Sequence, residues 1–388
     1  MLAIVNGKIY TMADEPIENG SVLIEDGKIK EIGTDLNIPD GCEVIDAKGN
    51  MVTPGLVDAH SHIGLDEEGI RFEGADYNEM TDPITPQMRA IDGIYPEDKG
   101  FLIARQAGVT SVVTGPGSAN PIGGTFVAIK TYGNRVDDMI IKNPVAMKIA
   151  FGENPKRVYS ERKQTPITRM GTMALMREFI SKAKEYLEKK ESGKEVEWNA
   201  KYEAFIPVLK KEIPLKAHAH RSDDIFSAIR LAKEFDLEMT LDHVTEGHLI
   251  AEELANEKYE LIVGPNLSNA AKYELKNRNY KTPAALYNAG KNVAIMTDNP
   301  VIPTSQINIC AGLAHRSGLP EYEALRAITI NAANITGISD RVGSLEVGKD
   351  ADLVVWSDNP ILSTSAESLY TIINGEVVYK STDEKYGF

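Results

Sequence analysis

The chain has 388 residues, of which 42% are hydrophobic and 26% are charged, and its formal net charge is −15. This length suffices for one large α/β barrel or for a few ordinary domains, and it allows a large buried core. The negative charge argues against nucleic acid and against an anionic membrane as the main partner.

Cysteine usage and the first residues indicate the compartment. Cys42 and Cys310 are the only cysteines, and they lie far apart in the sequence. Such a pair indicates neither a disulfide framework nor a cysteine-based metal site. The N-terminus lacks the basic and apolar segments of a signal peptide, and no run of about 18 apolar residues could span a membrane. We therefore expect a cytoplasmic protein without a membrane partner.

Short strands are predicted at both ends of the chain. Leu2–Val5 is apolar and runs into an Asn-Gly turn, and Ser21–Ile24 precedes an Asp-Gly turn. The C-terminal end repeats the pattern, with a strand at Asp352–Trp356 followed by a hairpin. Strands at both ends, with a different pattern between them, predict one small β domain formed by residues 1–52 together with 338–388.

Between these ends, residues 53–337 alternate strand-like apolar runs with helical segments. This alternation implies parallel strands joined by crossover helices. Eight candidate strands match a closed (β/α)8 barrel, and an open doubly wound sheet has the same local pattern. The eight are Leu56–Ala59, Val109–Val113, Phe126–Thr131, Val145–Phe151, Leu215–Ala217, Glu238–Leu241, Leu261–Val263 and Val293–Met296.

Two histidines end the first of these strands. In V-T-P-G-L-V-D-A-H-S-H, His60 and His62 lie two positions apart at the end of an apolar run. Residues with this spacing on an extended chain point to the same side, so both imidazoles can reach one metal ion. Taken alone, the pair is equally consistent with a strand end that happens to have two polar rings.

Three later strands also end in residues that bind metals, namely His218, His243 and Asp298. Barrel enzymes have their active sites at the carboxyl ends of the strands, so these side chains would meet His60 and His62. Neutral imidazole and carboxylate ligands suit Zn²⁺, and also Fe, Mn or Co. The sequence therefore predicts a site for one or two divalent transition metal ions, with Zn²⁺ as the first choice.

The set of motifs resembles the amidohydrolase superfamily of metal-dependent hydrolases, and within it the imidazolonepropionase-like members. The resemblance covers nearly the whole chain and implies a (β/α)8 TIM barrel with a small composite β-sandwich formed by both termini. The matching motifs are V-T-P-G-L-V-D-A-H-S-H (52–62), A-H-A-H (217–220), L-D-H (241–243), M-T-D-N (296–299) and G-S-L-E-V-G-K-D-A-D-L-V-V-W (343–356).

The resemblance also implies roles for the five residues at the strand ends. His60 and His62 would bind the more buried metal. His218 and His243 would bind a second metal, or would help to bind a single one. Asp298 would lie beside the water that reacts, accept its proton and pass that proton to the leaving nitrogen.

Two metal ions about 3.5–4 Å apart need an anion between them. Two residues of M-K-I-A-F-G-E-N-P-K-R (147–157) could supply it. Glu153 resembles the glutamate ligand of adenine deaminases, and Lys148 resembles the lysine that other members have as a carbamate. We favour Glu153 because its side chain is already anionic.

Substrate contacts are expected from His220 and Arg221. The side chain of His220 points the same way as that of His218, but by the family pattern the first histidine is the ligand. We therefore assign His220 to the substrate pocket. Arg221 and Arg157 are each able to pair with a substrate carboxylate in two hydrogen bonds, although an exposed surface position is the commoner explanation for an arginine.

Together these features predict a metal-dependent hydrolase of a carbon–nitrogen bond in an amide or cyclic amide, with a small-molecule substrate. The alternatives in the same chemistry are a dipeptidase or carboxypeptidase acting on an N-acyl amino acid, and a deaminase. An alternative from another class is a non-catalytic barrel scaffold, against which the intact set of metal-binding residues argues. Homo-oligomers are common for this fold.

Overall fold

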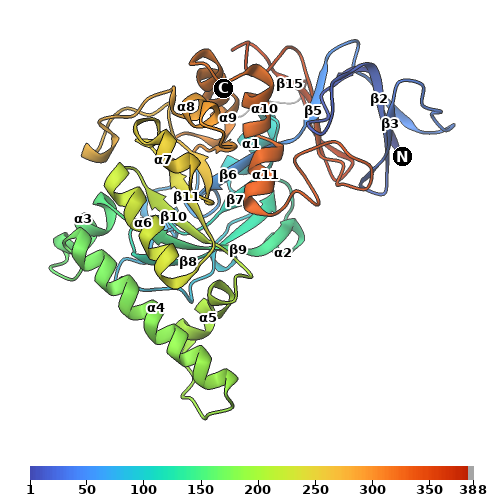
Figure 1. Ribbon diagram of the computed structural model, residues 1–388. Coiled ribbons are helices and arrows are strands. Elements are labelled where there is room, and N and C mark those ends of the chain that lie inside the picture. Colours follow the sequence, from blue (N-terminus) through green and yellow to red (C-terminus); the bar gives the residue numbers. More distant parts are fainter. Residues whose placement is uncertain (383–388) are drawn as a thin grey trace.

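The computed structural model describes residues 1–382, and their strands form two eight-stranded sheets. Figure 1 shows a barrel covered by helices and, beside it, a smaller β unit that contains both ends of the colour range. The barrel sheet has the order β13-β12-β11-β10-β9-β8-β7-β6, and each strand overlaps one predicted strand. The strands are β6 (Leu56–Ser61), β7 (Val109–Thr114), β8 (Ile122–Lys130), β9 (Ile140–Ala150), β10 (Leu215–Ala219), β11 (Met239–His243), β12 (Glu260–Val263) and β13 (Val293–Ile295).

Backbone hydrogen bonds join the two edges of this sheet just beyond β13. The N–H of Asp298 donates to the carbonyl oxygen of His60 at 3.1 Å, and the N–H of His62 donates to that of Asn299 at 2.9 Å. The carboxylate of Asp58 on β6 also accepts a hydrogen bond from the N–H of Thr297, at 3.2 Å. These hydrogen bonds form a seam between the end of β6 and the residues after β13. The seam places His60 and His62, the expected ligands, directly beside Asp298, the expected proton acceptor.

The expectation of strands that are all parallel is wrong for β8, which runs antiparallel to both β7 and β9. The other pairings described in this sheet are parallel. The reason is the short link between β7 and β8, residues 115–121. A parallel crossover needs about a dozen residues or more, so this link can only reverse the chain.

Helices cover the outside of the barrel, and α4 (Arg169–Glu191) with α5 (Ala200–Leu209) forms a hairpin that projects from it (Figure 1). Met176, Ile180 and Ala183 of α4 are buried at helical spacing, which fixes the face that packs on the core. No helix within residues 1–382 has the length and apolar character to cross a bilayer. The other helices are α1 (Lys99–Gln106), α2 (Val136–Met139), α3 (Glu153–Glu161), α6 (Ser222–Phe235), α7 (Ala251–Ala255), α8 (Thr282–Asn288), α9 (Ile307–Arg316), α10 (Glu321–Ala327) and α11 (Ile330–Thr336).

The second sheet is built from both ends of the chain, where β14 pairs antiparallel with β5. Its strand order is β16-β15-β14-β5-β1-β2-β3, with β4 beside β1. The sheet folds back on itself, because Ile29 exchanges backbone hydrogen bonds with Gly348 and Lys349 and so encloses an apolar core. The strands are β1 (Leu2–Ile9), β2 (Ile17–Glu25), β3 (Lys28–Gly33), β4 (Glu43–Asp46), β5 (Met51–Pro54), β14 (Leu353–Trp356), β15 (Ser368–Ile373) and β16 (Glu376–Lys380).

A buried ion cluster connects the two sheets. Lys130, at the end of β8, is buried, and its Nζ lies 2.9 Å from Asp350 and 2.5 Å from Asp352. Both carboxylates precede β14 and are buried as well. Lys28 and Arg341 also pair with Asp350, at 2.6 and 2.8 Å, so cations surround this carboxylate at the junction between the barrel and the composite sheet.

Candidate metal centre

The expected metal-binding side chains meet at the end of the barrel where the parallel strands finish. Two groups have ligand atoms that all lie within 4.8 Å of one another: His218, His220 and His243 form one, and His60, His243 and Asp298 form the other. His243 belongs to both groups. The histidines named here are buried, whereas the side chain of Asp298 is 14% exposed.

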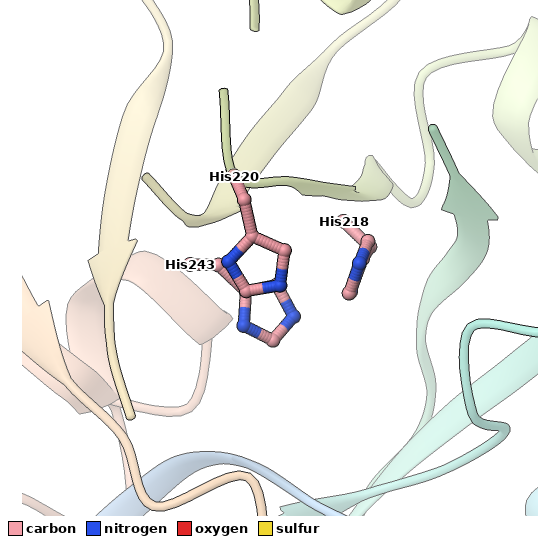
Figure 2. Close-up of side chains that lie close together, drawn as sticks. All are labelled: His218, His220 and His243. Atoms are coloured by element: carbon pink, nitrogen blue, oxygen red, sulfur yellow. The ribbon is translucent and has the colours of Figure 1, made fainter. Parts of the chain in front are cut away.

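Figure 2 shows how the rings of the first group converge from neighbouring strands. The ring centroids of His218 and His243 are 4.1 Å apart, those of His220 and His243 are 4.4 Å apart, and those of His218 and His220 are 4.7 Å apart. His220, which the sequence assigned to the substrate pocket, thus lies within a group that could bind a metal.

Backbone carbonyl oxygens fix which ring nitrogen of His62 and of His243 is available to bind a metal. Nδ1 of His62 donates to the carbonyl of Gly115 at 2.7 Å, and Nδ1 of His243 donates to that of Gly264 at 2.9 Å. A carbonyl oxygen can only accept, so the proton resides on Nδ1 and the lone pair on Nε2. This is the second contact that metal-binding histidines usually make, and it leaves Nε2 as the ligand atom.

His60 is oriented by a buried carboxylate that the sequence analysis missed. Its Nδ1 donates to Asp242, and Nζ of Lys216 lies 2.8 Å from the same carboxylate oxygen. Lys216 also donates to the carbonyl of Ala59 at 3.0 Å. Asp242 stands inside the L-D-H motif, one residue before His243, so its place on β11 was the available signal.

Asp298 faces the histidines of β6. Its Oδ1 lies 3.2 Å from Nε2 of His62 and 3.6 Å from Nε2 of His60. The residue has a φ of 56°, a left-handed conformation that Asp tolerates better than most residues. The turn after β13 therefore directs the carboxylate back toward the barrel axis.

Several polar atoms here fit a metal ion better than they fit a closed protein interior. Nδ1 of His218, Nε2 of His243 and Oε1 of Glu274 are buried without a hydrogen-bond partner among residues 1–382. Such an atom costs about 1–3 kcal/mol when it stays unsatisfied. Burial lowers the pKa of His218 and of His243 well below the usual range, which keeps both rings in the neutral form that binds metals. The donor set therefore fits a divalent transition metal.

Lys148 and Glu153, the two candidates for a bridging anion, lie in different places. Lys148 is fully buried, its Nζ lies 3.3 Å from Nε2 of His60, and burial lowers its pKa to about 8. Glu153 begins α3, and its carboxylate accepts a hydrogen bond from the N–H of Glu274 at 3.3 Å. Within residues 1–382, Glu153 is in neither ligand group. The structure thus brings Lys148, rather than Glu153, to the histidines.

Arg221 does not reach this centre. Its guanidinium donates twice to Asp223, both times at 2.9 Å, and lies over the ring of Tyr273 at 5.9 Å. Arg157, the other arginine considered from the sequence, instead lines a cavity of about 260 Å³ beside the histidines. Other residues around this cavity are His62, Tyr77, Asn154, His218, Lys272 and Asp298.

The amidohydrolase family model matches residues 51–378, and the chain belongs to the amidohydrolase family. It is 26% identical over 401 residues to an imidazolonepropionase of Sphingopyxis alaskensis, covering 95% of this chain and 93% of that protein. It is 30% identical over 383 residues to the amidohydrolase tasK of Hapsidospora irregularis, covering 88% of this chain but only 38% of that longer protein. The crystal structure of an amidohydrolase from Thermotoga maritima matches with a TM-score of 0.95 and 44% identity, covering 98% of this chain and 100% of that one.

Membership of this family supports a hydrolase that acts on carbon–nitrogen bonds of small molecules. It agrees with the resemblance drawn from the motifs and with a barrel joined to a composite β unit. The His and Asp groups could bind the divalent metal that is typical of the family.

Proposed function

We propose that the protein hydrolyses an amide or cyclic amide at a metal centre formed by His60, His62, His218 and His243, with Asp298 as the proton carrier. The observation that supports this best is the convergence of buried imidazoles at one end of the barrel, among which His218 and His243 each have a ring nitrogen without a partner within the described residues. A scaffold protein would gain nothing from nitrogens left unsatisfied in this way, because each costs about 1–3 kcal/mol.

A divalent metal bound here, with Zn²⁺ as first choice and Fe, Mn or Co as alternatives, would polarise the substrate carbonyl and lower the pKa of a water to about 7. The protein's own residues perform the remaining tasks. Asp242 holds His60 in one orientation through Nδ1, and the carbonyl of Gly115 does the same for His62. If two ions bind, Lys148 is the better placed candidate for the bridging anion, as a carbamate formed with carbon dioxide.

Asp298 has the position required to move a proton. Its carboxylate lies beside His62 and lines the cavity, so it can contact both an attacking water and a bound substrate. It would accept the proton of that water at one carboxylate oxygen and donate it to the leaving nitrogen. The leaving nitrogen would then depart as a neutral amine rather than as an anion.

The variant Asp298→Asn tests this assignment. We expect it to retain its metal content and to lose most of its turnover, because the amide oxygen is a weak base. Activity should be measured on a panel of N-acyl amino acids, dipeptides and cyclic amides, with metal content determined for each preparation. Asp223→Asn is the matched control, since Asp223 pairs with Arg221 away from the cavity. Full activity of Asp298→Asn would refute the proton-carrier role.

An N-acyl amino acid is the second candidate substrate, and one observation favours it. Arg157 and Lys272 both line the cavity and could pair with a substrate carboxylate. A deaminase would use the same metal chemistry on a ring carbon. The scaffold alternative is tested by metal analysis: a purified chain that neither contains nor takes up a transition metal would favour it.

A further inference from the structure

A second cavity, of about 370 Å³, adjoins the one beside the histidines, and we call it the outer cavity. Tyr77, Asn78 and Gly117 line both cavities, so the two meet at these residues. The ring of Tyr77 also lies against that of His62, with the centroids 5.4 Å apart. A small molecule bound at the histidines can therefore extend past Tyr77 into the outer cavity.

The place where the two cavities meet is held by specific backbone contacts. The N–H of Gly117 donates to the carbonyl of Tyr77 at 2.7 Å, and the N–H of Ala119 donates to Oδ1 of Asn78 at 3.1 Å. A Cβ at Gly117 would lie 2.7 Å from Cδ2 of Tyr77, so the two segments approach this closely because residue 117 is glycine. The long segment after β6 is thus fixed as a wall of both cavities.

The outer cavity has an excess of carboxylates. Asp76, Glu79 and Asp92 line it, and Arg89 is the cation among its lining residues. Arg89 is already bound by Asp92 through two hydrogen bonds of 2.8 Å. Neither Asp76 nor Glu79 forms an ion pair within residues 1–382. Two negative charges in this cavity therefore lack a cation among the described residues.

An uncharged acceptor in the same lining also lacks a donor. Oε1 of Gln87 is buried and has no hydrogen-bond partner within the described part of the chain, which is unfavourable unless a ligand supplies an N–H or O–H. Nearby, burial raises the pKa of Glu67, and the carboxylates of Asp98, Asp76 and Glu73 raise it further, as expected where the local potential is negative. An ammonium or a guanidinium, which is cationic and only donates, suits these surroundings.

The cavity beside the histidines has the opposite charge. Arg157 and Lys272 line it together with Asp298, and both cations could pair with a substrate carboxylate. If the carboxylate of an N-acyl amino acid lies there and its amide lies at the histidines, the acyl chain must point elsewhere. The outer cavity, reached past Tyr77, is the adjoining space.

We propose that the outer cavity is a subsite for the acyl part of the substrate, and that it selects acyl groups ending in an ammonium or a guanidinium. The inference rests on the proposed amide hydrolysis and names a substrate class for it, N-acyl amino acids with a cationic acyl chain. Asp76 and Glu79 receive the cation, and Tyr77 flanks the chain where the two cavities meet.

Matched pairs of substrates test the charge preference on the full, metal-loaded chain. A series of ω-aminoacyl derivatives of one amino acid, from β-alanyl to ε-aminocaproyl, is compared with the alkanoyl derivatives in which a methyl group replaces the ammonium. We expect kcat/KM to favour the longer ω-aminoacyl substrates by about fivefold or more, the upper range for a partly exposed ion pair. Added salt should reduce this preference, because it screens exposed charges.

The double variant Asp76→Asn with Glu79→Gln assigns the preference to these two side chains. Both are exposed, so the variant should fold, and it should bring the ratio of the two kcat/KM values close to one. Differences in metal content or folded fraction affect both substrates of a pair equally and cancel in this ratio. Asp223→Asn is the matched control, because Asp223 pairs with Arg221 away from both cavities, and it should keep the ratio of the unmodified chain.

The inference and the proposed function can fail separately. If the unmodified chain hydrolyses both members of every pair equally well, or if the double variant keeps the preference, the subsite is refuted while amide hydrolysis stands. If no amide is hydrolysed, the proposed function falls, and calorimetric titration of the chain with ε-aminocaproate and with heptanoate still decides on the subsite. Tighter binding of ε-aminocaproate that the double variant loses would support the subsite, and equal binding of the two acids would overturn it.

Discussion

Replacing Asp242 by asparagine tests how the barrel holds His60. One oxygen of Asp242 accepts from Nδ1 of His60 and lies 2.8 Å from Nζ of Lys216, and these three side chains are buried. Asparagine keeps an oxygen for His60 but removes the charge, which leaves the ammonium of Lys216 with the carbonyl of Ala59. Breaking a buried pair by removing one partner costs about 3–5 kcal/mol, so the free energy of unfolding of the metal-free variant should fall by that amount.

The effect on metal binding should be separate and smaller. Loss of the carboxylate behind a metal-binding histidine typically lowers affinity about 10–100-fold, which corresponds to about 1.4–2.8 kcal/mol. The double variant Asp242→Asn with Lys216→Met removes the stranded ammonium as well. It should regain most of the lost stability, while its metal affinity stays low because His60 still lacks its anionic partner.

Urea unfolding of the metal-free proteins measures the first effect, and chelator competition on the metal-loaded proteins measures the second. The single variant Lys216→Met completes the double-mutant cycle. It measures how much of the stability that Asp242 contributes depends on the ammonium of Lys216. Equal stability of Asp242→Asn and the unmodified chain would refute the reasoning, and so would a double variant that is no more stable than the single one.

Two further predictions concern the junction between the sheets and the cavity. Burial raises the pKa of Asp350, but Lys130 and neighbouring cations outweigh it and hold the pKa below its ordinary value of 3.8. A carboxyl group whose pKa is lower in the folded state stabilises that state at pH values above the pKa of the unfolded chain. Asp350→Asn should therefore lower the free energy of unfolding at neutral pH. Urea titrations should show this deficit shrinking as the pH falls below 3.8. Arg157→Met should raise KM for an N-acyl amino acid and leave kcat largely unchanged, and it should not change KM for uncharged amides. Arg221→Met is the control: the cation of Arg221 already pairs with Asp223, so this variant should leave both constants unchanged.

The sequence predicted the positions of the barrel strands well, because each is a short apolar run between turn signals. It did not predict the direction of β8, since alternation of residue types along a strand is the same in both directions. The deciding feature was the length of the link at residues 115–121, which is too short for a crossover.

For the site, residues at strand ends were predictable and residues in loops were not. His218, His243 and Asp298 lie at or just beyond the carboxyl ends of strands, which must meet in a barrel. The structure groups His243 and Asp298 with His60, and it places His62 beside Asp298. Glu274 lies in a loop, where chain position says little about which side chain turns inward. The choice between Lys148 and Glu153 needed the same spatial information, because one lies within β9 and the other just beyond it.

The two halves of the site differ in how their side chains are held. His60, His62 and Asp298 share backbone hydrogen bonds across the seam between β6 and the residues after β13, and side chains on such a framework keep their geometry better than side chains on loops. Glu274 instead depends on the reciprocal contact of its loop with Glu153. Glu274 thus faces His218 and His220 from a loop, whereas His60 and Asp298 are joined through hydrogen-bonded backbone.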